Sequence, residues 1–350
     1  MTAARAGERP LSAGLLALLL AGLGGAALTS VGLPLAWLLG AMFATTGAAL
    51  VGLRVAVPDR WRAVMIAVLG VLLGSWITPE LVRALSRWTV SLALLPVYIL
   101  AVGALTYALL RRWARLDPVT AWYSAAPGGL SEMILAGERE GGDSRTIALL
   151  HTVRLFLVVA SIPLVIQAAG IVRGPGLPAT TAWPPLGELA ALIAAGAVGL
   201  WIGGRLRIPA GPLVGPLVAS GALHLAGLVT AAPPRETVIA AQVVVGASIG
   251  VRFTGVRPHE LARMVVQGAA TTLVMLATTA LVAALLHTSL GLPLAATALA
   301  FVPGGLAEMS LIALALHADP AFVASHHIVR IALVVGLATV LLRRLRHLLG

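Results

Sequence analysis

One short motif occurs twice in this chain, and its second copy follows the first at an offset of 176 residues. The segment PGGLSEM at 127–133 returns as PGGLAEM at 303–309. A histidine–arginine pair keeps the same offset, with His151 and Arg154 in the first copy and His327 and Arg330 in the second. A register held over about a hundred residues indicates a duplication. We therefore divide the chain into two homologous repeats, 1–175 and 176–350.

Each repeat consists of long apolar runs separated by short polar breaks. Apolar residues make up 59% of the 350 residues and charged residues only 11%, whereas soluble domains carry about 25% charged residues. Such a chain cannot cover the surface of soluble domains, and the absence of cysteine excludes a disulfide-bonded scaffold. Most runs approach the ~20 residues that a helix needs to cross a bilayer. The sequence therefore predicts an all-α polytopic membrane protein. The runs lie near 11–30, 34–52, 63–78, 89–110, 118–137 and 146–170 in the first repeat, and near 186–204, 209–229, 237–253, 262–286, 293–316 and 321–342 in the second.

The first run follows Arg5 and Arg9 and has the pattern of a signal peptide. We expect it to be the first membrane-spanning helix instead, because the run 186–204 stands at the matching place in the second repeat.

Arginine supplies the whole basic charge, with 24 arginines, no lysine and a net charge of +11. The arginines lie mostly in the short breaks, as the positive-inside rule describes for cytoplasmic loops. No segment between the apolar runs is long enough for a DNA-binding module, so direct nucleic-acid binding is not expected. The lipid bilayer and a small-molecule or ion substrate are the expected partners, and a homo-oligomer is left open.

The direction of the two repeats depends on the runs that carry the PGG motif. If 118–137 and 293–316 dip into the membrane and return, each repeat crosses five times and the two repeats are inverted. If both runs cross, the repeats have six crossings each and are parallel. The parallel alternative moves Arg205, Arg207, Arg252, Arg257 and Arg263 to the outside. The positive-inside rule therefore favours inverted 5+5 repeats in the cell inner (plasma) membrane, with both termini cytoplasmic.

A Pro-Gly-Gly sequence inside an apolar run is costly. Proline lacks an N–H group, glycine weakens a helix by about 1 kcal/mol, and unpaired backbone groups in hydrocarbon cost several kcal/mol each. The break survives where protein or a water-filled cavity satisfies the backbone, so Gly128, Gly129, Gly304 and Gly305 are candidate site residues. A plain proline kink between packed helices is the alternative.

Glu132 and Glu308 follow the glycines and fall in the first turn of the next half-helix, where the helix dipole favours negative charge. Each glutamate either caps its own half-helix or forms a proton or cation site, because an intramembrane carboxylate is a functional candidate. Ser131 precedes Glu132 and is a further candidate ligand, whereas Ala307 replaces it in the second copy.

The spacing of three residues puts His151 and Arg154 on one helix face, and likewise His327 and Arg330. Each arginine lies about 15 Å beyond its expected helix start, close to the middle of the membrane. A buried arginine needs an anion, and the obvious partner is a glutamate of a broken segment. The alternative is a role in binding a substrate anion or relaying a proton.

The remaining patterns point to packing. Gly70 and Gly74, with Gly246 and Gly250 in the second repeat, allow close approach of helices. The few histidines show no metal-ligand spacing and there is no cysteine, so neither a metal site nor another cofactor is expected.

The duplicated PGGL(S/A)EM motif followed by His-x-Val-Arg resembles the AbrB-type membrane protein family, whose members carry the AbrB duplication. The resemblance covers essentially the whole chain. The labels of this family imply three functions: a transporter, a regulator of gene expression and an ammonia monooxygenase. The paired breaks favour a secondary transporter of a small solute, such as an organic anion, an amine or a proton-coupled solute. A membrane-embedded regulator acting through partners is the alternative. An enzymatic oxygenase role is not expected, because the copper or iron ligands that it needs are missing.

Overall fold

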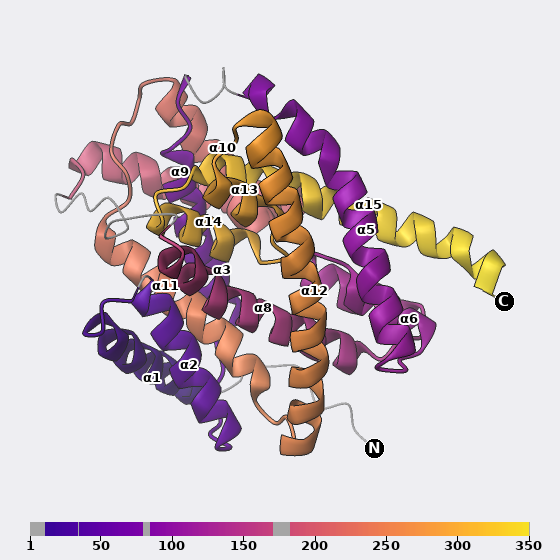
Figure 1. Cartoon of the computed structure of the whole chain (residues 1–350). Coiled ribbons are helices and arrows are strands. Elements are labelled where there is room, and N and C mark those ends of the chain that lie inside the picture. Colours follow the sequence, from indigo (N-terminus) through magenta and orange to yellow (C-terminus); the bar gives the residue numbers. More distant parts are fainter. Residues whose placement is uncertain (1–10, 34, 80–84, 171–182, 350) are drawn as a thin grey trace.

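Every regular element in the described residues is a helix. The computed structural model describes residues 11–33, 35–79, 85–170 and 183–349. Both chain ends, Arg5, Arg9 and the predicted repeat boundary at 175–176 lie outside these ranges. The predicted first repeat contains α1 (Leu11–Thr29), α2 (Ala36–Leu50), α3 (Asp59–Gly74), the 3-10 helix η1 (Leu85–Trp88), α5 (Thr89–Arg112), α6 (Pro118–Ala125), α7 (Leu130–Arg139) and α8 (Ser144–Ala168). The second contains α9 (Leu186–Arg205), α10 (Gly211–Leu225), α11 (Arg235–Gly250), η2 (Val251–Phe253), α12 (Pro258–Leu290), α13 (Leu294–Phe301), α14 (Leu306–Ala315) and α15 (Pro320–Leu349). Figure 1 shows how these helices pack around one another.

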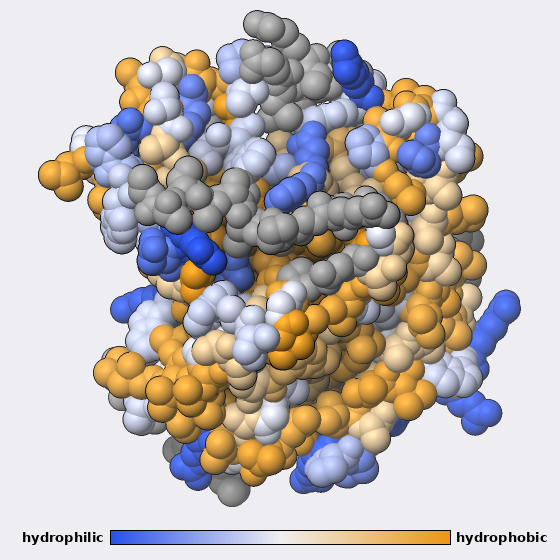
Figure 2. Space-filling view, turned by 60° about the vertical axis from the view of Figure 1, so that its left-hand side comes forward, coloured by the Kyte–Doolittle hydropathy of each residue, from blue (hydrophilic) through white to orange (hydrophobic). Residues whose placement is uncertain are grey.

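Six helical segments in the described residues are long and apolar enough to cross a membrane, in α1, α5, α8, α9, α11–η2 and α12. Large apolar side chains stand exposed on the outer helices, for example Leu19 on α1, Val97 on α5, Trp201 on α9 and Leu281 on α12. Much of the surface in Figure 2 is accordingly apolar. Exposed apolar area of this extent marks a lipid-facing surface. The chain is a multi-pass, all-helical membrane protein, and this part of the prediction is confirmed.

The predicted apolar runs match the observed helices closely. The run 118–137 is divided into α6 and α7, and the run 293–316 into α13 and α14, with the PGG motifs between the two helices of each pair. Each break therefore separates two short helices and is more than a kink in one continuous helix.

Glycines let helices of the two repeats approach until their backbones touch. A Cβ atom on Gly70 of α3 would lie 2.4 Å from the carbonyl oxygen of Leu213 on α10, and one on Gly246 of α11 would lie 2.3 Å from that of Leu38 on α2. Both distances are far below van der Waals contact, so only glycine fits at either position. Gly70 and Gly246 keep the offset of the repeat, so matching glycines make matching contacts. The sequence predicts that these glycines are packing residues, and their contacts agree with that prediction.

Candidate functional site

The first broken segment is a hairpin that returns to the place where it starts. The backbone N–H of Asp143, just after α7, donates to Oγ1 of Thr120 in the first turn of α6, with 2.8 Å between the two atoms. Gly142 also lies against α6, because a Cβ on it would be 3.0 Å from Cγ1 of Val119. Gly137 of α7 packs against Tyr123 of α6. The two half-helices therefore run side by side, and the PGG motif forms the tip of the hairpin.

Local sequence signals set the ends of these half-helices. The side chain of Asp117 caps α6 by accepting from the N–H of Thr120 at 2.9 Å, and Pro118 occupies the first helical position. Pro127 disfavours helical geometry in the preceding residue, so α6 ends at Ala125. Gly129 begins α7 with φ at 62°, a left-handed conformation that glycine adopts freely.

The His–Arg pair of α8 binds the exposed carboxyl end of α6. His151 Nε2 lies 2.8 Å from the carbonyl oxygen of Tyr123. Arg154 Nη1 donates to the carbonyl oxygen of Ala126 at 3.0 Å, and Arg154 Nη2 lies 2.9 Å from His151 Nδ1. The last turn of a helix leaves its carbonyl groups without intrahelical partners, and here the two side chains supply the missing donors.

The second repeat contains the same arrangement on α13. His327 Nε2 lies 2.9 Å from the carbonyl oxygen of Leu299, and Arg330 Nη1 donates to that of Val302. Arg330 Nη2 donates to the carbonyl oxygen of Gly304 at 2.7 Å and lies 3.0 Å from His327 Nδ1. Because arginine can only donate, the Nδ1 atom must accept, so the histidine is neutral with its proton on Nε2.

These contacts differ from the glutamate–arginine pair that the sequence suggested. In the described part of the chain neither Arg154 nor Arg330 makes an ion pair. Each arginine faces the carboxyl end of the half-helix before the break, where the helix dipole is negative and favours a cation. The glutamates follow the break, in the first turn of the next half-helix.

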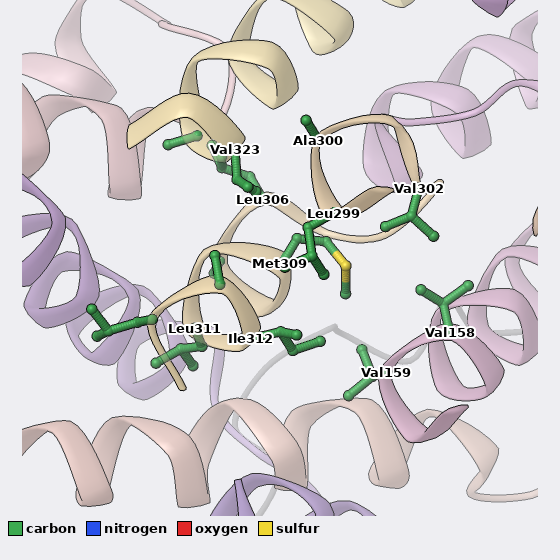
Figure 3. Close-up of a cluster of buried hydrophobic side chains, with 14 of the residues drawn as sticks. Val158, Val159, Leu299, Ala300, Val302, Leu306, Met309, Leu311, Ile312 and Val323 are labelled. Atoms are coloured by element: carbon green, nitrogen blue, oxygen red, sulfur yellow. The ribbon is translucent and has the colours of Figure 1, made fainter. Parts of the chain in front are cut away.

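The two breaks approach each other. A Cβ on Gly128, at the tip of the first hairpin, would lie 3.7 Å from Nε of Arg330, which binds the carbonyl groups of the second break. Arg154 and Arg330 are close enough for their charges to repel. In Figure 3, Val158 and Val159 of α8 face Val302 and Met309 of the second broken segment. Of the residues proposed from the sequence, Gly128, Gly304 and Arg330 thus lie together.

The two glutamates occupy different environments. Glu308 is 3% exposed, and its carboxylate lies against Gly305, where a Cβ would be 2.0 Å from Oε2. Glu132 is only partly buried, and Ser131 beside it is exposed. The two copies of the motif are therefore not equivalent, and Glu308 is the more enclosed acid.

Sequence reasoning did not include Arg252 among the site residues. Arg252 lies in η2, its Nη1 atom is buried without a hydrogen-bond partner, and its charge interacts with those of Glu308 and Arg62. Arg62 Nε donates to Oγ of Ser248 at 3.2 Å. The signal for Arg252 was its departure from the repeat, because Trp76 occupies the matching position in the first copy.

Comparison with known proteins identifies the family. The sequence profile described as "Transition state regulatory protein AbrB" matches residues 37–346, most of the chain. The chain belongs to the AbrB family. The resemblance that the duplicated motif indicated is thereby confirmed.

Two curated relatives span nearly the whole AbrB-family chain. "Uncharacterized protein YhjN" of Bacillus subtilis (strain 168) is 26% identical over 356 residues, covering 93% of this chain and 91% of the relative. "Putative regulator AbrB" of Escherichia coli (strain K12) is 27% identical over 305 residues, covering 86% of this chain and 87% of the relative. No solved structure matches the chain.

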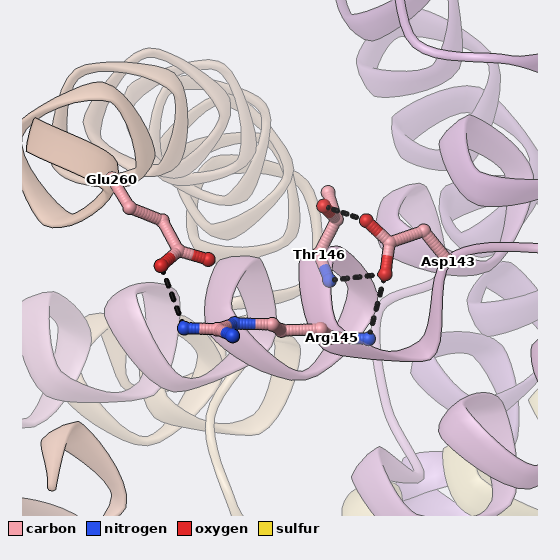
Figure 4. Close-up of polar contacts among 4 residues, drawn as sticks. All are labelled: Asp143, Arg145, Thr146 and Glu260. Carbon is pink, nitrogen blue, oxygen red and sulfur yellow. Dashed lines mark hydrogen bonds and ion pairs between the residues drawn. The ribbon is translucent and has the colours of Figure 1, made fainter. Parts of the chain in front are cut away.

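A polar cluster in this AbrB-family chain marks the start of α8 near the base of the first hairpin (Figure 4). Asp143 caps α8, accepting from the N–H groups of Arg145 and Thr146 and from the hydroxyl of Thr146. Burial raises the pKa of Asp143, but these hydrogen bonds outweigh it and hold the pKa below its usual value. Arg145 pairs with Glu260 of α12 at 2.7 Å. The pair shows that α8 and α12 begin on the same side of the molecule.

Proposed function

We propose that this AbrB-family protein is a secondary transporter of a small solute, with its site where the two broken segments meet. The observation that carries the proposal is the contact of Arg330, which binds two carbonyl groups of the second break and lies against Gly128 of the first. Paired interruptions at corresponding positions of two repeats are the usual setting of a transporter site. Irregular backbone inside a membrane is tolerated where it is enclosed by protein or lines a cavity.

The helix directions support the inverted 5+5 arrangement over the parallel 6+6 one. The helices α5 and α12 correspond under the repeat offset. The helix α5 leads into α6, whose first turn lies beside Asp143 at the start of α8. The ion pair between Arg145 and Glu260 brings the start of α12 to that side as well. Because α5 ends on the side where α12 begins, corresponding helices run in opposite directions. With the positive-inside rule, this arrangement supports our proposal that both termini are cytoplasmic, and we propose the plasma membrane as the location.

Single cysteines distinguish the two arrangements on this thiol-free background. Arg54, Arg205 and Ser289 are exposed and suit replacement by cysteine. In intact cells, an impermeant maleimide should label Ser289→Cys, while Arg54→Cys and Arg205→Cys react only after the membrane is opened. Parallel repeats would give the reverse result for Arg205→Cys and Ser289→Cys, with Arg54→Cys again protected.

Glu308 is the acid best placed to couple solute movement to a proton or cation. It is buried at the second break, and its charge interacts with the guanidinium of Arg252. Gaining or losing a proton there changes the charge of an enclosed site, which can favour one conformation over another.

The transport proposal is tested in proteoliposomes with acetate, lactate, phosphate and methylammonium as labelled probes, with and without a pH gradient. Glu308→Gln keeps the side-chain size and removes the charge, so gradient-driven uptake should fall about tenfold or more, the factor that a loss of 1.4 kcal/mol produces. The matched control is Glu236→Gln, which changes an exposed glutamate also in the first turn of its helix. We expect Glu132→Gln, at the more open first break, to have a smaller effect. Uptake by Glu308→Gln equal to that of the parent would contradict the assignment of this site.

A second candidate function is a membrane-embedded regulator, favoured by the name "Putative regulator AbrB" of the Escherichia coli relative. Such a protein would act on gene expression through partners. The test uses a deletion strain and measures its transcript levels. Regulation is favoured over transport if these levels change in the deletion strain and return to normal when the strain produces the transport-deficient Glu308→Gln variant.

A further inference from the structure

We infer that the solute bound between the two breaks is an anion, specifically a short-chain carboxylate. This inference rests on the proposed transport function and names its substrate class. Arg154 is 5% exposed and Arg330 is 1% exposed, and within the described residues neither makes an ion pair with a carboxylate. Two neighbouring buried cations without counter-charges form a site that favours an anion.

One donor of Arg330 has no acceptor. Its two terminal nitrogens bond to the carbonyl groups of Val302 and Gly304, but its Nε atom is buried and has no hydrogen-bond partner among the described residues. The Nε atom lies 3.7 Å from the position that a Cβ on Gly128 would take. A buried N–H without an acceptor is costly, and a carboxylate oxygen beside Gly128 would satisfy it.

The backbone around this point also favours negative charge. The helix α7 begins at the tip of the first hairpin, with Gly129 as its N-terminal flanking residue. At the second break, the carboxylate of Glu308 already lies against Gly305 at the start of α14. Free N–H groups and the positive end of the helix dipole make such helix starts favourable for anions. Gly128 has no positive φ, and a Cβ on it would make no contact closer than 3.7 Å, so a side chain can be introduced there without a clash at its Cβ.

The walls beside the cations are apolar. Val334 lies 3.9 Å from the same Cβ position on Gly128, and Val158, Val159 and Val302 belong to the adjoining buried cluster. A small oxyanion with an aliphatic tail satisfies both the donors and the walls. This combination selects a short-chain carboxylate over phosphate, which would leave most of its oxygens against hydrocarbon.

A tethered carboxylate tests the inference. Gly128→Asp places a carboxylate within reach of Arg330 Nε, whereas Gly128→Asn has the same shape without the charge. In detergent without added ligand, Gly128→Asp should melt at a higher temperature than Gly128→Asn. Sodium butyrate at about a hundred times its Kd should raise the melting temperature of the parent by about 2–4 °C and leave that of Gly128→Asp unchanged. Sodium chloride and methylammonium chloride at equal ionic strength are the controls.

The outcomes separate this inference from the transport proposal. If butyrate does not stabilise the parent, or if it stabilises Gly128→Asp equally, the carboxylate site is wrong. If proteoliposomes accumulate only methylammonium, the carboxylate assignment is also wrong while transport stands. If butyrate stabilises the parent selectively but no probe crosses proteoliposomes, the anion site stands and the transport proposal is wrong.

Discussion

Arg330→Leu is expected to cause the largest loss of stability of any single change at the site. The variant removes the guanidinium donors from the carbonyl oxygens of Val302 and Gly304 and from Nδ1 of His327. The carbonyl oxygen of Val302 keeps one bond, from the backbone N–H of Gly304. Unsatisfied buried polar groups of this kind, left by removing one side of a buried network, cost about 3–5 kcal/mol in total. We expect the variant to be nearly absent from the monodisperse peak in size-exclusion chromatography and to lose most of its cooperative thermal transition.

The first repeat supplies the matched comparison. Arg154→Leu removes a donor from one carbonyl group, that of Ala126, so its cost should be smaller than that of Arg330→Leu. Arg330→Lys keeps the charge but presents a single ammonium in place of the planar fork, so it should recover only part of the lost stability. Arg235→Leu, at an exposed position, should melt close to the parent. A melting temperature of Arg330→Leu within a degree of the parent would show that the breaks are held by other contacts.

The helices could be predicted because their signals are local. A run such as 89–110 becomes α5 because a largely apolar, uncharged stretch of that length favours a spanning helix. The first PGG motif divides α6 from α7 because proline and glycine act on their own neighbours. The spacing of His151 and Arg154 also placed both on one face of α8. Each of these inferences needed only residues within a few turns of one another.

The partners of the buried arginines could not be predicted in the same way. The obvious counter-ion of Arg154 was a glutamate, but its guanidinium reaches the carbonyl of Ala126, a contact between residues 28 positions apart. That contact exists because α6 ends beside α8, which is a property of the packed hairpin. Arg252 was not predicted as a site residue for a related reason, because only the fold brings η2 near Glu308.

A valine at either repeat-related glycine should separate the helices that join the two repeats. In Gly70→Val the new Cβ would lie 2.4 Å from the carbonyl oxygen of Leu213, and in Gly246→Val 2.3 Å from that of Leu38. Because the obstructing atoms belong to the backbone of α10 or α2, a change of rotamer cannot relieve the clash. We therefore expect a loss of about 3 kcal/mol or more, at or beyond the upper end for overpacked cores, measured as thermal stability in detergent.

The control is Gly103→Val in the middle of α5, where a Cβ would meet no atom within 4 Å. It introduces the same side chain into a helix without the clash, so its melting temperature should stay near that of the parent. If Gly103→Val loses as much stability as Gly70→Val, the effect belongs to valine in a helix and not to the contact between repeats.

Because Gly70 and Gly246 make matching contacts, the losses of stability in Gly70→Val and Gly246→Val should also be similar. Unequal losses would mean that one of the two helix pairs, α3 with α10 or α2 with α11, can separate at lower cost. That pair is then the better candidate for the element that moves in the proposed transport cycle.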